Sequence, residues 1–210
     1  MRHVEYRTIV ADPPWDHSDG TGYSFGHKDP RGRSGKHGPT SHSLPYPVMT
    51  LEEIKALQVE KLSAPDATLY LWTTNRYLEA AYDIVRAWGY KPGTLLVWCK
   101  PKNQGLFGGG WLSNVEYVLT GKRGSPKING KEGTRWYEWP RRAHSEKPEA
   151  MQDMVERMND APYLELFARR QRLGWDTWGN EALNHVELVP HIDKALPRGG
   201  AERTPNETQA

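Results

Sequence analysis

A short apolar run that stops at two prolines constrains this chain more than any other feature. Residues 8–11 have the β-branched, apolar character of a buried strand, and Asp12, Pro13, Pro14 and Trp15 follow directly. Proline cannot extend a sheet ladder, so the chain must leave the sheet there. Ligands bind at the carboxyl ends of strands in open α/β sheets. We therefore expect the Asp12 carboxylate, an uncommitted Pro13 carbonyl and the Trp15 ring to lie together at a binding site, although a purely structural turn would carry the same residues.

Composition sets broad limits on the class of protein. The 210 residues fit one domain, which we expect to span residues 1–196 before a polar, disordered tail at 197–210. The formal net charge of +2 permits an anionic partner without requiring one. A single cysteine, Cys99, excludes an intramolecular disulfide and fits a reducing compartment. No run approaches the roughly 20 apolar residues that span a membrane, and the start lacks the apolar core of a signal peptide, so we expect a cytoplasmic protein.

Helical and strand periodicities alternate along the first half of the chain. Thr50 and Glu53 have the spacing of a capping box, which predicts a helix over 51–61. Asn75 is placed to cap a second helix, which Gly89 would end. Strands are predicted at 67–74 and 94–100.

The second half continues this alternation. It predicts a loop at 105–110, strands at 115–119 and 163–168, an edge strand within 135–140, and a helix that begins near Pro148. Strands that alternate with helices favour right-handed crossovers and a mainly parallel sheet covered on both faces. We therefore expect a doubly wound α/β fold.

Four further segments place polar residues where a strand ends or a helix begins. Their sequences are YLWTTN at 70–75, HSEKP at 144–148, LELFAR at 164–169 and GWDTWGNE at 174–181. Together with DPPW, and in this order, they resemble the MT-A family of adenine N(6)-methyltransferases, which includes messenger-RNA adenosine methyltransferase subunits and bacterial and phage DNA enzymes. The resemblance runs from about residue 8 to 181. It implies a Rossmann-like methyltransferase fold in permuted order, with the catalytic strand early and the cofactor strand late.

The resemblance also implies which residues form the site. The catalytic loop would be Asp12, Pro13, Pro14 and Trp15. The pocket for S-adenosyl-L-methionine would be lined by Asp12, Lys147, Glu165, Phe167, Arg169, Asn180 and Glu181. The substrate base would contact Trp15, Tyr46, Trp72 and Asn75. Many relatives have glycine where this chain has Ala168, a change that would crowd the approach to the cofactor.

The resemblance further suggests a role for each of the main site residues. Lys147 would neutralise the cofactor carboxylate and Glu165 would bind the ribose hydroxyls. Asp12 and the Pro13 carbonyl would accept the two N–H groups of adenine and stabilise the charge that develops on nitrogen. Trp15 would stack on the base.

Two basic segments are the predicted nucleic-acid contacts. One is 17–43, with Lys28, Arg31, Arg33 and Lys36; the other is 122–142, with Lys127, Lys131, Arg135, Arg141 and Arg142. A solvated charged loop explains either segment equally well. We expect no metal site, because His17, His27, His37 and His42 lack ligand spacing and nearby cysteines.

The leading hypothesis is an S-adenosylmethionine-dependent adenine N(6)-methyltransferase that acts on DNA. RNA is the alternative substrate. A catalytically silent nucleic-acid-binding subunit and a methyltransferase for a small molecule or protein remain open, as does a homo- or heterodimer.

Overall fold

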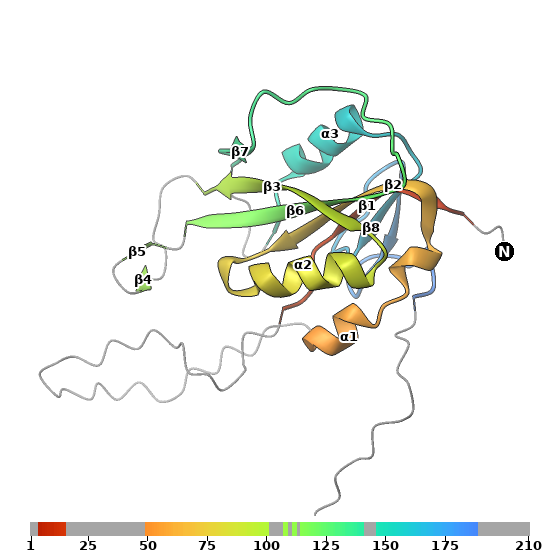
Figure 1. Cartoon of the computed structure of the whole chain (residues 1–210), viewed down its shortest axis with the longest axis horizontal. Helices are drawn as coiled ribbons and strands as arrows, with labels where there is room; N and C mark the ends of the chain where they lie inside the picture. Colours follow the sequence, from red (N-terminus) through yellow and green to blue (C-terminus); the bar gives the residue numbers. More distant parts are fainter. Residues whose placement is uncertain are drawn as a thin grey trace, which may run out of the picture.

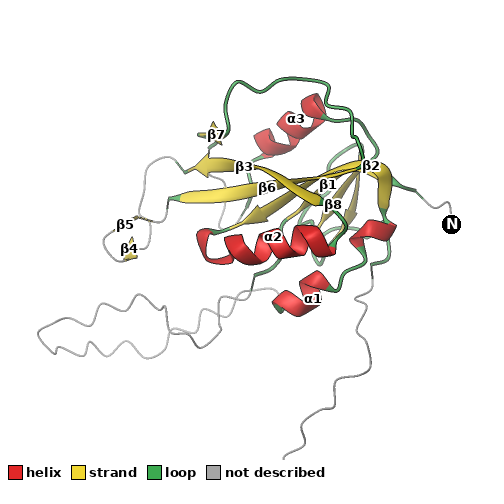
Figure 2. Cartoon of the chain, in the orientation of Figure 1, coloured by secondary structure: helices red, strands yellow, loops and turns green. Residues whose placement is uncertain are grey.

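The protein is built on one seven-stranded sheet with helices on both faces (Figures 1 and 2). The computed structural model describes residues 4–15, 49–100, 107–108, 111–112, 114–140 and 146–188. The strand order is β7-β3-β6-β2-β1-β8-β9. The strands are β1 (Tyr6–Ala11), β2 (Ser63–Thr73), β3 (Lys91–Cys99), β6 (Val115–Arg123), β7 (Trp136–Tyr137), β8 (Tyr163–Leu166) and β9 (Trp175–Trp178), and a separate pair is formed by β4 (Phe107–Gly108) and β5 (Trp111–Leu112). The helices are α1 (Leu51–Lys55), α2 (Leu78–Ala87) and α3 (Glu149–Met158), with 3₁₀ turns at Val59–Lys61 and Asn75–Tyr77.

The predicted, mainly parallel sheet is confirmed, with one exception. β1 pairs in parallel with β2 and β8, β8 with β9, and β3 with β7. β6 is antiparallel to both of its neighbours, β2 and β3. A helix between two strands carries the chain back to the edge where the first strand began, so that the second strand runs parallel to it. Among the described residues between β3 and β6 there is only the short β4–β5 pair, and the chain enters β6 from the edge where β3 ends.

Alternating side chains of the central strands build two cores. Leu69 and Leu71 of β2 pack with α1 and α2, whereas Tyr70 and Trp72 of the same strand pack with α3. Figure 1 shows α1 and α2 below the sheet and α3 above it. The doubly wound fold is therefore confirmed.

The helix predicted over 51–61 is shorter than expected. The capping box is present, since the Glu53 amide donates to the Thr50 hydroxyl and the Thr50 amide donates to the Glu53 carboxylate. The α-helix nevertheless ends at Lys55. Leu57 and Val59 are both fully buried, and residues two apart cannot share one face of an α-helix.

The predicted cap at Asn75 is wrong. Asn75 begins a 3₁₀ turn whose N-cap is Thr74, and α2 starts only at Leu78. The end of α2 is as predicted: Gly89 has a φ of +80° and its amide donates to the Arg86 carbonyl.

Candidate active site

A pocket of about 320 Å³ opens where β1, β2 and β8 end and β6 begins. Nine residues predicted for the site line it: Asp12, Pro13, Pro14, Trp15, Lys147, Phe167, Arg169, Asn180 and Glu181. Five other lining residues, Thr73, Thr74, Ala168, Trp178 and Gly179, lie within the sequence motifs but were not assigned to the site, and only Met49 and Glu116 lie outside the motifs. Segments from both ends of the chain meet here because β1 lies between β2 and β8.

The first wall is the turn that follows β1. The Trp15 amide donates to the Pro13 carbonyl at 2.9 Å, and the Met49 amide donates to the Pro14 carbonyl at 3.2 Å. The Pro13 carbonyl is therefore not uncommitted, as the sequence suggested, because one of its two lone pairs is used within the turn. The second lone pair is left for another donor.

Trp15 is held mostly inside the protein. It is 5% exposed, and its ring stacks on Tyr77 with centroids 5.0 Å apart and planes 13° apart. One face of the indole is therefore covered by Tyr77. The indole nitrogen of Trp15 and the hydroxyl of Thr74 are buried without a hydrogen-bond partner in the described part of the chain. Both residues line the pocket, and such unpaired polar atoms are uncommon in a protein interior.

The second wall consists of the two turns that follow β8 and β9. Phe167 has a φ of +63°, so the strand predicted to reach Ala168 ends at Leu166. The Ala168 amide donates to the Trp178 carbonyl at 3.0 Å, and the rings of Phe167 and Trp178 meet edge to face.

The close approach between these two turns depends on glycine at position 179. A Cβ on Gly179 would collide with backbone atoms of Ala168. The glycine that this part of the site requires is therefore at 179, and the side chain of Ala168 is buried.

Four charged side chains of alternating sign form a row from the end of β3 to the end of β1, and three of them line the pocket. We call Lys100, Glu116, Lys147 and Asp12 the pocket cluster. Lys147 Nζ lies 2.9 Å from Asp12 Oδ1 and 3.3 Å from Glu116 Oε2, and Lys100 pairs with Glu116. All four side chains are largely buried, with exposures of 15–22%. The Lys147 ammonium also lies 5.3 Å from the centre of the Trp72 ring.

Burial and charge oppose each other in the pocket cluster. Burial raises the pKa of Asp12, and the nearby Lys147 partly offsets this. Burial also acts to raise the pKa of Glu116, but Lys147 and Lys100 outweigh it and lower that pKa. Burial would lower the pKa of Lys147, yet its two carboxylate partners raise it. Lys147 therefore stays charged and favours the ionised form of Asp12.

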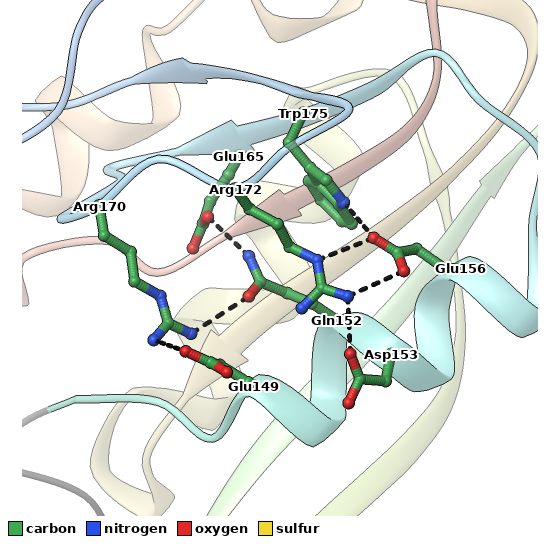
Figure 3. A network of polar contacts seen from close by, with 8 residues as sticks. All are labelled: Glu149, Gln152, Asp153, Glu156, Glu165, Arg170, Arg172 and Trp175. Atoms are coloured by element: carbon green, nitrogen blue, oxygen red, sulfur yellow. Dashed lines mark hydrogen bonds and ion pairs between the residues drawn. The ribbon is translucent and has the colours of Figure 1, made fainter.

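Three of the predicted site residues that the structure describes do not line the pocket. Trp72 is 2% exposed and lies in the core beneath Lys147. Asn75 is exposed beyond Thr74. Glu165 points toward α3, where Gln152 Nε2 donates to it at 2.8 Å, as Figure 3 shows. Burial and the Asp12 charge raise the pKa of Glu165 to about 7. Tyr46, also predicted for the site, lies outside the described residues.

Glu116 is the residue whose absence from the predicted set matters most. It is the second residue of a strand, and a polar residue at that place is unremarkable in a sequence. Only the antiparallel direction of β6 brings its beginning to the edge where β2 ends. No signal in the sequence indicated that direction.

Only part of the basic segment 122–142, predicted to contact nucleic acid, lies toward the edge of the sheet where the pocket opens. Lys122, near the end of β6, pairs with Thr68 of β2 and with Lys91, the first residue of β3, and Lys127 lines a hollow with Arg7 toward the amino edge of the sheet. Trp136, in contrast, pairs with Val97 near the carboxyl end of β3. Residues 17–43, 141 and 142 lie outside the described ranges.

Neither a metal-binding cluster nor a membrane-spanning helix is present in the described residues. No group of three or more His, Cys, Asp or Glu residues there is placed to hold a metal ion. None of the helices described is both long and apolar enough to cross a membrane.

Comparison with known proteins identifies the family. The MT-A70 sequence profile matches residues 6–181. Type II methyltransferase M.MunI from Mycoplasma is 34% identical over 193 residues, which are 89% of this chain and 82% of the relative. The Arabidopsis thaliana protein "N(6)-adenosine-methyltransferase MT-A70-like" is 31% identical over 98% of this chain and 30% of its own. The human "N(6)-adenosine-methyltransferase catalytic subunit METTL3" is 27% identical over 88% and 29%.

Proposed function

Because this chain belongs to the MT-A70 family, we propose that it transfers a methyl group from S-adenosylmethionine to the 6-amino group of adenine in DNA. The observation that carries the proposal is the Asp12 carboxylate, fixed at the end of β1 by Pro13 and Pro14 and held 2.9 Å from the Lys147 ammonium. A rigid acceptor of this kind suits an amine that must be oriented for attack.

The pocket residues fit the cofactor. A volume of about 320 Å³ lies within the roughly 300–1,000 Å³ of small-molecule sites. S-adenosylmethionine carries a carboxylate, two cationic centres and a nucleoside, and the lining offers both signs of charge, through Arg169 and Glu181 among others, beside the aromatic rings of Phe167 and Trp178. Asp12, Lys147, Arg169, Asn180 and Glu181 would hold it, and when bound it supplies an electrophilic methyl carbon.

The roles proposed for Lys147 and Glu165 differ from those that the family resemblance implies. Lys147 is already neutralised by two carboxylates, so we assign it first to the ionisation of Asp12 and second to the cofactor carboxylate. Glu165 lies behind the pocket lining, bonded to Gln152. Its proposed contact with the ribose requires the carboxylate to turn from Gln152 toward the pocket.

Asp12 and the Pro13 carbonyl are the proposed acceptors for the adenine amine. The lone pair of that amine is delocalised into the ring, and it becomes available only when nitrogen turns tetrahedral. Two acceptors that bind its two N–H groups favour this geometry and stabilise the positive charge that develops on nitrogen. Asp12 acts only when ionised, which Lys147 favours. Once methylated, the ammonium is acidic enough to lose its proton to water, so Asp12 need not be the base.

Trp15 is the proposed contact for the adenine ring. Tyr77 already covers one face of the indole. The base can therefore use only the other face or the edge of Trp15, and Thr74 adds a hydroxyl without a described partner on the same pocket wall.

DNA is the proposed polymer because M.MunI, a bacterial relative, is matched over most of its own length. RNA is the second candidate. It is favoured by the names of the plant and human relatives, of which this chain spans less than a third. We do not favour a silent binding subunit, because the motif at 12–15 lines the pocket and the pocket cluster is complete.

The test is transfer of tritium from labelled S-adenosylmethionine to oligonucleotide pools that are matched in DNA and RNA and contain adenine. We expect label in DNA and its loss in Asp12→Asn, which keeps the side-chain shape but removes the charge. Label in RNA alone would replace the substrate assignment. Label in neither polymer would overturn the proposed function.

A further inference from the structure

Trp136 is an exposed aromatic residue on an edge strand. It is 58% exposed, whereas Trp15, Trp72, Trp88, Trp98 and Trp175 are buried. β7 forms the last position of the sheet, and in the described part of the chain it pairs only with β3. Arg135 directly precedes β7 and Trp136 begins it, and because neighbouring residues in extended chain point to opposite sides, the two side chains leave this last strand on either side.

A continuous series of contacts links this edge to the pocket. Tyr137 stacks on Trp139 at 4.2 Å, and the Trp98 indole donates to the Trp139 carbonyl at 2.9 Å. Lys100 lies over the Trp98 ring and begins the pocket cluster, which ends at Asp12. Trp136 and Asp12 therefore both lie toward the carboxyl edge of the sheet, and packed side chains connect them.

The distance along this edge of the sheet corresponds to a short stretch of nucleic acid. β7 and β1 are four strand spacings apart, or about 19 Å at about 4.8 Å per spacing. A stacked strand rises about 3.4 Å per nucleotide, so about six nucleotides reach from the pocket to Trp136.

Charge at β7 suits a polyanion. Arg135 is exposed, and none of the described residues forms an ion pair with it. An exposed arginine next in sequence to an exposed indole offers the two elements of single-strand binding, a cation for phosphate and a flat ring for a base.

We propose that Trp136 and Arg135 bind the single strand that flanks the target adenine, about six nucleotides from it. Trp136 stacks on a base and Arg135 contacts a phosphate. The inference rests on the proposed function for the nature of the polymer, and it adds a second contact outside the pocket.

The segment that carries Trp136 also provides matched controls. Ile128 is 50% exposed and Lys127 is exposed, yet both lie toward the amino edge of the sheet, since the next residue, Asn129, bonds to the end of α3. Ile128 is an exposed apolar side chain like Trp136, and Lys127 is an exposed cation like Arg135, but both lie at the edge of the sheet opposite the pocket.

The experiment measures equilibrium binding of fluorescently labelled single strands to the full chain by anisotropy, in DNA and RNA arms. Each strand contains a single adenine, with two or twelve nucleotides on each side of it, and the flanks have a random sequence of the other three bases. Trp136→Leu should weaken long-strand binding about tenfold and leave short-strand binding unchanged, since stacking on an aromatic side chain is worth about this factor. Trp136→Phe should retain most of the long-strand affinity, and Ile128→Ala should equal the wild type.

Salt dependence tests the arginine. Arg135→Gln should lower the slope of log Kd against log salt by about 0.7, the value of one phosphate contact on a single strand, whereas Lys127→Gln should not. Equal long-strand affinity in Trp136→Leu and wild type would overturn the inference, and so would an equal loss on short strands. If the protein methylates adenine but Trp136→Leu binds long strands as wild type does, the proposed function stands and this inference fails. If binding depends on Trp136 but no methyl group is transferred, this inference stands and the proposed function fails.

Discussion

Two clusters of charged residues use similar side chains in different settings. The pocket cluster is a largely buried row at the carboxyl edge of the sheet. The second, which we call the helix cluster, joins α3 to the segment between β8 and β9 through Arg170 and Arg172 (Figure 3). Arg172 bonds to both Glu156 oxygens and to Asp153, and Arg170 bonds to Glu149 and Gln152. The α3 carboxylates Glu149, Asp153 and Glu156 in this cluster are 34–53% exposed.

The charges of the pocket cluster tune the ionisation of the site, whereas those of the helix cluster secure a helix. In the pocket cluster each member changes the pKa of the next, because little water screens them. In the helix cluster solvent screens much of the attraction, and the geometry serves mainly to fix α3 against β9. Gln152 links the two regions, since its amide accepts from Arg170 and donates to Glu165.

Removal of the central cation should give the largest effect. Lys147→Met leaves Asp12 and Glu116 buried without the ammonium between them, so the pKa of Asp12 should rise. We expect kcat/KM to fall about 100-fold at about pH 7, the scale of one lost electrostatic contact in an active site. Part of the loss should be recovered as the pH rises, because Asp12 with a raised pKa ionises again at higher pH.

The matched control is Lys61→Met, which removes an exposed lysine far from the pocket. If the loss of kcat/KM in Lys147→Met is the same at every pH, or if Lys61→Met loses as much kcat/KM, the pocket cluster does not tune the pKa of Asp12.

Glu165 should destabilise the protein above neutral pH. Its pKa is about 7 in the folded protein, against the ordinary value of 4.5 that it regains in the unfolded chain, so the native state holds an extra proton between these values. Stability therefore falls as pH rises from about 4.5 to 7 and stays low above that. Glu165→Gln should be more stable than wild type by about 3 kcal/mol near pH 8, and the difference should vanish near pH 4. Urea unfolding at both pH values measures this, and an equal stability difference at the two would contradict it.

Lys100 should affect Asp12 indirectly, through Glu116 and Lys147. Lys100→Met takes one of two cations from Glu116, which then draws Lys147 away from Asp12. We expect the acid limb of the kcat/KM profile to move to higher pH, with a loss of about fivefold on that limb and little change on the alkaline plateau, since one pH unit corresponds to about tenfold. Lys100→Arg should restore the profile. A loss of the same size at all pH values would indicate a structural role instead.

The smallest effect on activity should come from the helix cluster. Arg172→Gln removes three hydrogen bonds to partly exposed carboxylates and should lower stability by about 1 kcal/mol. Methyl transfer at about 25 °C should stay within about twofold of wild type, because a stability change of that size leaves the protein folded. A tenfold loss of activity in a variant that is folded would break the distinction between the clusters.

Most of the fold was accessible from the sequence, because hydrophobic periodicity and turn residues are local signals. The end of β1 at Asp12 and the end of α2 at Gly89 were fixed by the residues at those points. The direction of β6 was not, since the pattern of a buried strand is the same in either direction.

The same division holds for the site. Nine residues identified by motif line the pocket, but Glu116 depends on strand direction. The burial of Trp72 and the turn of Glu165 toward Gln152 depend on which face of the sheet α3 covers. The occupied Pro13 carbonyl depends on the geometry of a single turn.

The most direct test of the central claim is to identify the methylated atom. An adenine-containing oligonucleotide is incubated with the protein and S-adenosylmethionine, digested to nucleosides and analysed by chromatography with mass spectrometry against N6-methyl and N1-methyl standards. We expect methyl on the 6-amino nitrogen alone, and its disappearance in Asp12→Asn. Methyl on ring nitrogen N1, or an undiminished yield from Asp12→Asn, would contradict the assignment of Asp12 and the Pro13 carbonyl as acceptors for that amine.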